Sequence, residues 1–364
     1  MQNKIVTKTK LVISDLHLGK GRKLPNGMLN LLEDFLYDDR FAEFLEYYST
    51  PPYHEAEIEL ILNGDILNLI QVDYRGHFTT VITEQVSAEK VASVIQGHPV
   101  FFDALKKFLA NPKHSMTYVV GNHDQEMVWP TSRRLFDEAV GREITWKTTY
   151  HQVDGVHIEH GHQYEFANRV DPTKQFLTEN LPEPILNLPW GTIFTVQYII
   201  KLKMQKHFID KVRPFRLMIR MSLMQDFFSS LLHGLRFLIY FISVRFSKNR
   251  YRHTNLSMTF KTLFSATVFP DLTDAARRIL RTPNLHTVIF GHTHVYKHVP
   301  IGEAKQYLNT GTWIDITSLD LDNFAKRSKL TYVRIEYENN NQLAIPLLRH
   351  WIGRVPLEDD AMAM

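Results

Sequence analysis

Residues 10–18 read KLVISDLHL, an apolar run that leads directly into an aspartate and a histidine. The same arrangement recurs at IELIL (58–62) before Asn63-Gly64-Asp65 and at MTYVV (116–120) before Gly121-Asn122-His123-Asp124. It recurs again at VHI (156–158) before His160-Gly161-His162 and at TVIF (287–290) before Gly291-His292-Thr293-His294. Continuous apolar runs of this length are typical of strands buried on both faces. We therefore predict five buried strands, each followed by polar side chains.

Helical patterns lie between these runs. Met28–Tyr48 and Ala88–Leu109 space their apolar residues as helices do, the second interrupted at Gly97-His98-Pro99. Near the end, Thr331–Tyr337 and Gln342–Leu348 flank a polar ENNN turn and predict a hairpin. Alternating strands and helices indicate an α/β fold, in which ligand sites lie beyond the carboxyl ends of the strands. All five polar clusters occupy such positions.

The polar clusters carry metal-binding chemistry. They supply carboxylates from Asp15 and Asp65, an amide from Asn122, and imidazoles from the histidines, and the chain has no Cys. Such a donor set suits first-row divalent metals such as Mn, Fe or Zn. On an extended segment, residues i and i+2 point the same way, so we expect each His-x-His pair to face one side. Asp65 is the natural carboxylate to bridge two ions, which predicts a two-metal site for phosphoryl chemistry.

These five blocks, in this order, resemble the calcineurin-like metallophosphoesterase superfamily, and Tyr307–Trp313 (YLNTGTW) is similar to the segment that commonly follows its last block. The resemblance implies a four-layer α-β-β-α sandwich and two divalent ions, with Mn²⁺ first and Fe or Zn as alternatives. It implies one ion at Asp15, His17, Asp65 and His294, and a second at Asp65, Asn122, His160 and His292. A hydroxide bridging the ions would attack phosphorus, His123 would steady the charge or protonate the leaving oxygen, and Asp124 would orient His123.

Plainer interpretations exist for single residues. Asp15, Asp65 and Asp124 are each compatible with a helix N-cap after a strand. His162 is compatible with a phosphate contact or with the polar rim of a site. Asn68 stands where the family often has a second acid after Gly-Asp, and we expect it to be at most a hydrogen-bonding neighbour of the site.

Between the His160 and His292 blocks the pattern changes. We predict an α/β catalytic body over residues 1–165 and 270–350, a helical insertion over 166–269, and a C-terminal tail over 351–364. Cytoplasmic UDP-2,3-diacylglucosamine hydrolases of this superfamily are similar in placing a helical cap in the same interval. They differ in having Arg where His123 stands and His-Gly-Asp where this chain has His160-Gly161-His162.

The charge of the chain is uneven. Lys201 to His253 carries 12 Lys/Arg against two acids, a net of +10, whereas the whole chain has a net of +3. Phe227–Phe246 is strongly apolar but contains His233, Gly234 and Arg236, which disfavours a membrane span. An interfacial helix that meets acyl chains and anionic head groups fits this composition, as does a cap that packs on the body. A nucleic-acid groove ranks third because phosphate-binding surfaces seldom need so many apolar residues.

The sequence therefore predicts a metal-dependent hydrolase of a phosphate or pyrophosphate ester, acting on a lipid-linked, UDP-diacylglucosamine-like substrate. A soluble phosphodiesterase or phosphatase of nucleotides or nucleic acid is the first alternative. A non-catalytic, membrane-associated scaffold is the second. The N-terminal residues MQNKIVTKTK lack the apolar run of a secretory signal, so we expect a cytoplasmic protein, peripheral to the membrane if the insertion binds lipid.

Overall fold

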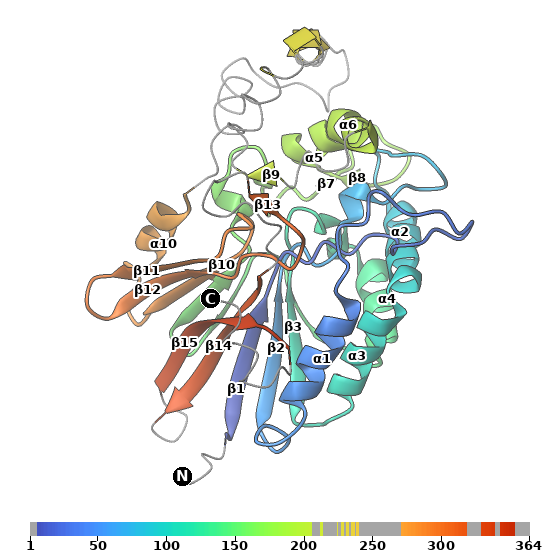
Figure 1. Cartoon of the computed structure of the whole chain (residues 1–364). Helices are drawn as coiled ribbons and strands as arrows, with labels where there is room; N and C mark the ends of the chain where they lie inside the picture. Colours follow the sequence, from blue (N-terminus) through green and yellow to red (C-terminus); the bar gives the residue numbers. More distant parts are fainter. Residues whose placement is uncertain are drawn as a thin grey trace.

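A computed structural model describes residues 6–205, 212–213, 271–318, 329–338 and 343–353, together with ten helical residues between 224 and 239. Two β-sheets lie face to face in its centre (Figure 1). The first has the order β15 (Leu343–Trp351), β14 (Leu330–Glu338), β1 (Lys8–Ile13), β2 (Glu57–Asn63), β3 (His114–Val119), β4 (Thr145–Lys147). The second has the order β11 (Lys297–Ile301), β12 (Lys305–Asn309), β10 (Thr287–Phe290), β6 (Val156–Glu159), β5 (Tyr150–Val153).

The five predicted strands are confirmed as β1, β2, β3, β6 and β10. β1 to β4 run parallel, as do β6, β10 and β12, so their carboxyl ends meet at one edge of the two sheets. The predicted C-terminal hairpin is confirmed by antiparallel β14 and β15, although β15 continues to Trp351, one residue beyond the predicted end of the body.

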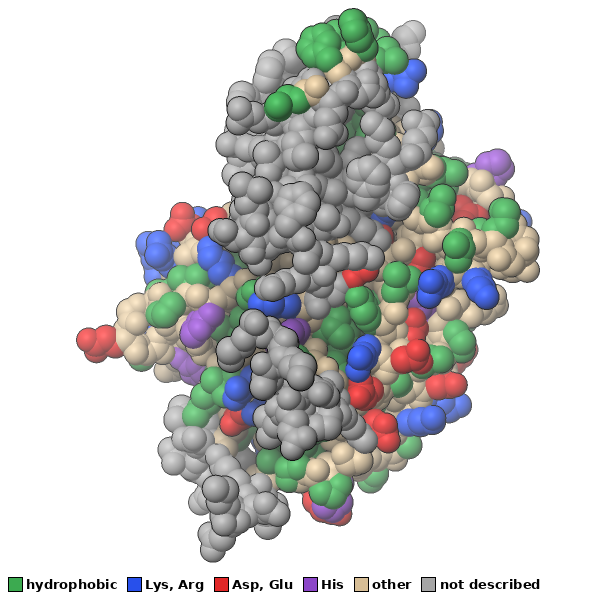
Figure 2. All heavy atoms as spheres, in the orientation of Figure 1, with side chains coloured by type: hydrophobic (Ala, Val, Ile, Leu, Met, Phe, Trp, Pro, Cys, Tyr) green, Lys and Arg blue, Asp and Glu red, His purple; other side chains and the backbone are tan. Residues whose placement is uncertain are grey.

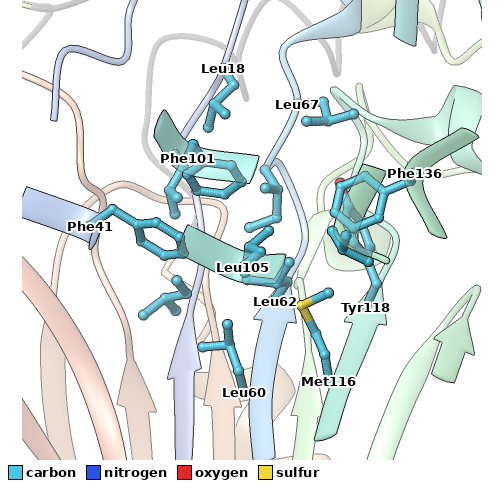
Figure 3. Packing of buried hydrophobic residues seen from close by; sticks show 14 of the residues in the cluster. Leu18, Phe41, Leu60, Leu62, Leu67, Phe101, Leu105, Met116, Tyr118 and Phe136 are labelled. Atoms are coloured by element: carbon cyan, nitrogen blue, oxygen red, sulfur yellow. The ribbon is translucent and has the colours of Figure 1, made fainter. Parts of the chain in front are cut away.

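Successive residues of the central strands are buried on opposite faces. In β2, Leu60 and Leu62 pack on the helices α1 (Asp38–Tyr48), α3 (Pro99–Leu109) and α4 (Pro130–Val140), as Figure 3 shows. Ile61, between them, packs against Ile158 and Ile289 of the second sheet. This alternation explains why the runs are continuously apolar rather than half polar.

The second sheet has its own outer layer. The helix α10 (Thr273–Ile279) packs its alanines on the outer face of β10 and β12. The described residues thus form the predicted four-layer α-β-β-α sandwich. Two further short strand pairs lie outside these sheets, β7 (Phe176–Leu177) with β8 (Ile185–Leu186) and β9 (Val212–Arg213) with β13 (Thr317–Ser318).

The helix predicted over Ala88–Leu109 is two helices, α2 (Glu84–Gly97) and α3, separated at His98 as Gly97 and Pro99 suggest. The helix predicted over Met28–Tyr48 is wrong in its first half, because α1 begins only at Asp38. The Glu33 side chain explains this difference: its carboxylate accepts the backbone N–H groups of Gly19, Gly21 and Phe35 at 2.7–3.1 Å. These bonds hold residues 19–37 as an irregular loop.

The start of the insertion lies over the carboxyl ends of the strands. It forms α5 (Trp190–Phe194), a π-helical turn η4 (Thr195–Ile199) and α6 (Ile200–Gln205). Val196 and Ile200 pack on Ile70 of the short helix η1 (Leu69–Gln71). Most of the remaining insertion, including much of Phe227–Phe246, lies outside the described residues. None of the described helices combines the length and apolar character needed to cross a membrane.

Candidate metal centre

The loops after β1, β2, β3, β6 and β10 bring the seven predicted ligand side chains together. Six of them, together with His123, form overlapping groups of three whose potential ligand atoms lie within 4.8 Å of one another. The first group is Asp15, His17 and His294, the second is Asp65, His160 and His292, and a third connects them through His17, Asp65 and His123. Asp65 and His17 each belong to two groups, and of these two side chains only the Asp65 carboxylate has two oxygens with which to bridge two ions.

The first group is closely packed. The Nε2 atoms of His17 and His294 lie 2.9 Å apart, and His294 Nε2 lies 3.3 Å from Asp15 Oδ1. Nitrogen and oxygen ligands of a divalent ion sit at about 2.0–2.2 Å from it, so neighbouring ligand atoms are roughly 3 Å apart. The spacing of these three side chains therefore fits a shared ion.

The second group lies beside a buried amide oxygen that makes no hydrogen bond. His160 Nδ1 lies 2.9 Å from the carbonyl oxygen of Asn63, to which it donates, so Nε2 remains as the ligand atom, 3.1 Å from Asp65 Oδ2. Asn122 Oδ1 is buried and makes no hydrogen bond among the described residues. Leaving such an atom unpaired costs about 1–3 kcal/mol, which a bound cation would remove.

The backbone at these ligands is unusual. Asp15, His17, Asp65, His292 and His294 all have positive φ, between 53° and 68°. This left-handed region is uncommon for residues other than Gly, although Asp and His tolerate it better than most. The extended geometry expected for the i, i+2 pairs is therefore wrong. Because the backbone turns sharply after β10, His292 and His294 join different groups instead of facing one side.

Two glycines make room for the carboxylates. A Cβ at Gly121 would lie 2.2 Å from Asp65 Oδ1, and one at Gly291 would lie 2.4 Å from Asp15 Oδ2. Both distances are far below van der Waals contact. The glycines of these motifs thus have a steric reason to precede Asn122 and His292.

The predicted contact between Asp124 and His123 is wrong. The Asp124 carboxylate accepts hydrogen bonds from the backbone N–H of Gly121 (2.6 Å), from that of Ile66 (2.8 Å) and from the Tyr118 hydroxyl (2.6 Å). Asp124 therefore ties together the loops after β2 and β3.

The partner of His123 is Asn68, which sequence analysis placed outside the site. His123 Nδ1 lies 2.8 Å from Asn68 Oδ1. The position of Asn68, three residues after Asp65, was the only signal for it.

A second residue missed from the sequence is Glu165. Its Oε2 lies 2.5 Å from His292 Nε2 and accepts a hydrogen bond from Asn168 Nδ2 at 2.7 Å. Carboxylates bonded to ligand histidines commonly fix the ring orientation of the histidine. Glu165 follows His160-Gly161-His162 by three residues, but nothing in that spacing distinguished it.

Electrostatics favour cation binding. Burial alone would raise the pKa of the Asp65 carboxyl, but neighbouring His160 and His123 hold it well below its usual range. Burial opposes the charge of His160, yet Asp65 and Asp15 raise its pKa to about 10. Burial lowers the pKa of His123 to about 3, against the attraction of Asp65. The site in the absence of metal thus holds ionised carboxylates, a charged His160 and a neutral His123, and a metal ion bound at His160 would replace its proton.

His162 lies beside the second group. Its ring centroid is 5.4 Å from that of His160 and 6.4 Å from that of His292. Burial holds its pKa well below the usual range, and its buried Nδ1 makes no hydrogen bond among the described residues. His162 is therefore a buried, neutral imidazole beside His160 and His292, and it is not among the residues that line the cavity.

A cavity of about 250 Å³ opens onto both groups. Five of the seven predicted ligands line it, and the insertion contributes Asn168, Thr195 and Ile199. The five are His17, Asp65, Asn122, His292 and His294. Sites that enclose a drug-sized ligand typically measure about 300–1,000 Å³. The cavity thus has room for a phosphate group and its immediate substituents, whereas a larger substrate would extend beyond it.

The chain resembles several solved structures at low identity. A dimetal phosphatase from Danio rerio has 9% identity and a TM-score of 0.39, with coverage of 96% of this chain and 97% of the other. The calcineurin-like phosphoesterase YfkN from Bacillus subtilis has 13% identity and a TM-score of 0.34, with coverage of 96% and 92%. A Vps29 single mutant from Entamoeba histolytica has 11% identity and a TM-score of 0.27, with coverage of 94% and 98%.

No curated protein sequence matches the chain. The sequence does match the family described as calcineurin-like phosphoesterase, over residues 9–296. This match runs from β1 to just beyond His294 and so contains all seven candidate ligands. The chain belongs to the calcineurin-like phosphoesterase family and is a metal-dependent phosphoester hydrolase.

Proposed function

We propose that this chain hydrolyses a phosphate or pyrophosphate ester at two divalent ions. One would be held by Asp15, His17, Asp65 and His294, the other by Asp65, Asn122, His160 and His292. The observation that carries the proposal is the set of overlapping ligand groups, connected through His17 and Asp65, that lie beside one cavity. Two ions bound there would neutralise phosphate oxygens and supply a water nucleophile for in-line displacement. Mn²⁺ is our first choice for a set of carboxylate, imidazole and amide donors.

His123 is the proposed proton donor to the leaving oxygen, and it would donate as the imidazolium, with Nδ1–H bonded to Asn68 and a second proton, taken up from water when the anionic ester binds, on Nε2. Its ring lies 4.6 Å from that of His17, edge to face, and it lines the cavity. Because Nδ1 is taken by Asn68, Nε2 is the atom left to contact a phosphate ester. Positioned general acids contribute about 10²- to 10⁴-fold to a rate.

The test uses Mn²⁺-loaded protein and bis(p-nitrophenyl) phosphate. We expect two ions per chain in the wild type, fewer in Asp65→Asn, and a full complement in His123→Gln with kcat lowered by about 10²-fold or more. His54→Gln is the matched control, because His54 is exposed and precedes β2, whereas Asp65 follows the other end of that strand. A wild type that binds no divalent ion and hydrolyses no phosphoester would refute the proposal.

We further propose that the substrate carries a lipid and that the insertion contacts anionic membrane through residues 190–253. Described helical residues of the insertion expose apolar side chains at spacings of mostly three or four, visible as green at the top of Figure 2: Met224, Phe227, Phe228, Leu231, Leu232, Leu235, Leu238 and Ile239. Spacing of this kind is that of one face of an amphipathic helix, and these residues lie within the block of net charge +10. An apolar face with surrounding Lys/Arg is what an interfacial helix needs.

Sedimentation with vesicles containing phosphatidylglycerol tests the membrane contact. Phe228, which is 82% exposed, is changed to Asp, and Ile352→Asp on the catalytic body is the control at a comparably apolar exposed position. We expect weaker binding for Phe228→Asp only. A substrate panel of lipid-linked pyrophosphates, nucleotides and oligonucleotides then identifies the leaving group. Preference for the soluble compounds would refute the lipid-linked substrate.

A further inference from the structure

The insertion places one lysine inside the catalytic body. The side chain of Lys203, in α6, is 0% exposed. Its Nζ donates to Asp34 Oδ1 and Oδ2, both at 2.8 Å, and to Gln71 Oε1 at 2.9 Å. On the same helix Lys201 is exposed, which is the usual state of a lysine. Burying an ammonium group costs several kcal/mol before pairing, so a pair of this kind needs an explanation beyond surface charge.

Hydrogen bonds connect the Lys203–Asp34 pair to His123, the proposed general acid. Asp34 Oδ2 also accepts a hydrogen bond from Asn68 Nδ2 at 3.1 Å, and Asn68 Oδ1 lies 2.8 Å from His123 Nδ1. Both Asp34 and Asn68 are buried. A continuous polar chain, Lys203–Asp34–Asn68–His123, thus joins the insertion to the site.

Chemistry fixes the direction of each hydrogen bond. An ammonium group only donates, and an ionised carboxylate only accepts. Asn68 must therefore present its amide N–H to Asp34 and its carbonyl oxygen to His123. That carbonyl can only accept, so His123 carries its hydrogen on Nδ1 and leaves Nε2 for the cavity. The charge of Lys203, three hydrogen bonds away from His123, thus determines which nitrogen of the His123 ring carries hydrogen.

We propose that Lys203 and Asp34 are positioning residues for His123. This role rests on the proposed hydrolysis. It makes the insertion part of the catalytic apparatus as well as a cover for the substrate. When Lys203 is seated, Asp34 is held to accept from Asn68. Without Lys203, the buried Asp34 loses its ammonium donor and takes up a proton, which changes its hydrogen bond with Asn68, so that the ring of His123 loses its fixed partner.

The first test separates positioning from docking. Lys203→Met is compared with Lys201→Met, its exposed neighbour on α6, on bis(p-nitrophenyl) phosphate. We expect Lys203→Met to lower kcat by about 10- to 100-fold, the range typical of residues that orient functional groups indirectly. KM and bound Mn²⁺ should match the wild type. Equal kcat in the two variants, or loss of metal in Lys203→Met, would overturn the proposal.

Double variants test the path. If the effect passes through Asn68, Lys203→Met adds nothing to the loss in Asn68→Ala, whereas independent effects would multiply. The pair Lys203→Met with Asp34→Asn removes the charge of Asp34 together with that of Lys203 but keeps an acceptor for Asn68. It should recover most of the kcat lost in Lys203→Met alone. Fully multiplicative losses of kcat, or no recovery of kcat in the double variant, would contradict a role for the hydrogen-bonded path from Lys203 to His123.

A spectroscopic measurement does not depend on turnover. Histidine ring ¹⁵N shifts are recorded on Mg²⁺-loaded protein, with the His123 signals assigned by their loss in His123→Gln. The wild type should show hydrogen on Nδ1 of a neutral ring, and Lys203→Met should change both nitrogen shifts while Lys201→Met does not. Hydrogen on Nε2 in the wild type, or unchanged shifts in Lys203→Met, would refute the positioning role even if the protein hydrolyses nothing.

Discussion

The buried histidine between α2 and α3 makes stability depend on pH. His98 is 2% exposed, with Nδ1 2.8 Å from Asp38 Oδ1 and Nε2 3.3 Å from Glu33 Oε2. Burial opposes its charge, but Asp38 and Glu33 raise its pKa from the usual 6.5 to about 9. The Glu33 carboxylate also holds the loop that carries Asp34. A change at His98 therefore reports on how firmly that loop is fixed.

The magnitude follows from linkage. One pKa unit corresponds to about 1.4 kcal/mol, so the protonated pair contributes about 3 kcal/mol to the free energy of unfolding. Because the folded-state pKa of His98 is raised, this contribution is complete below about pH 6.5 and is lost as pH rises through about 9. We expect the wild type to lose about 3 kcal/mol more than His98→Gln between these limits.

The assay is urea unfolding of metal-free protein at pH values from 6 to 9.5, followed by circular dichroism. His54→Gln, at an exposed histidine, controls for the loss of an imidazole as such. The difference in unfolding free energy between wild type and His98→Gln should shrink as pH rises. Two parallel stability curves over this range would show that His98 is not held charged by its two carboxylates.

Three further predictions concern the site and its supports. Glu165→Gln should weaken Mn²⁺ binding by about 10- to 100-fold in a competition titration with a metal indicator, and unchanged affinity would exclude a role in holding its histidine partner. Gly121→Ala should displace the Asp65 carboxylate and lower both metal content and kcat, and a crystal structure with Asp65 unmoved would contradict this steric argument. Lys90→Met should leave the buried Glu126 unpaired and destabilise the fold by about 3–5 kcal/mol, so a melting temperature equal to the wild type would refute the pair's importance.

The sequence predicted those parts of the fold that depend on repeated local patterns. The five buried strands could be predicted because each lies between two packed layers, and this position requires an unbroken apolar run. The loop over residues 19–37 was not, because Leu31, Leu32 and Phe35 have helical spacing while the Glu33 carboxylate, bonded to the backbone, prevents the helix. A side chain bonded to distant backbone leaves no periodic trace in the sequence.

The site was predicted to a similar extent. Residue types and their order indicated which side chains gather at the strand ends, but not the left-handed turns that direct them. The partner of His123 was assigned to Asp124 because that residue is adjacent in sequence. The structure gives Asn68 instead, since the loops after β2 and β3 cross and bring residue 68 beside residue 123. The sequence did not indicate a role for Glu165 or Lys203, because each belongs to a separate element that only the folded structure brings near the site.

Each proposed ion would take ligands from both sheets. Asp15 and Asp65 follow strands of the first sheet, whereas His160, His292 and His294 follow strands of the second. Neither half of the sandwich can assemble a complete ion site alone, so the last ligands become available only after the chain beyond β10 has been synthesised. Metal affinity is then part of the free energy that joins the sheets. In cells short of the metal, the two sheets of this protein would be less firmly joined. The protein would then be both less active and shorter-lived.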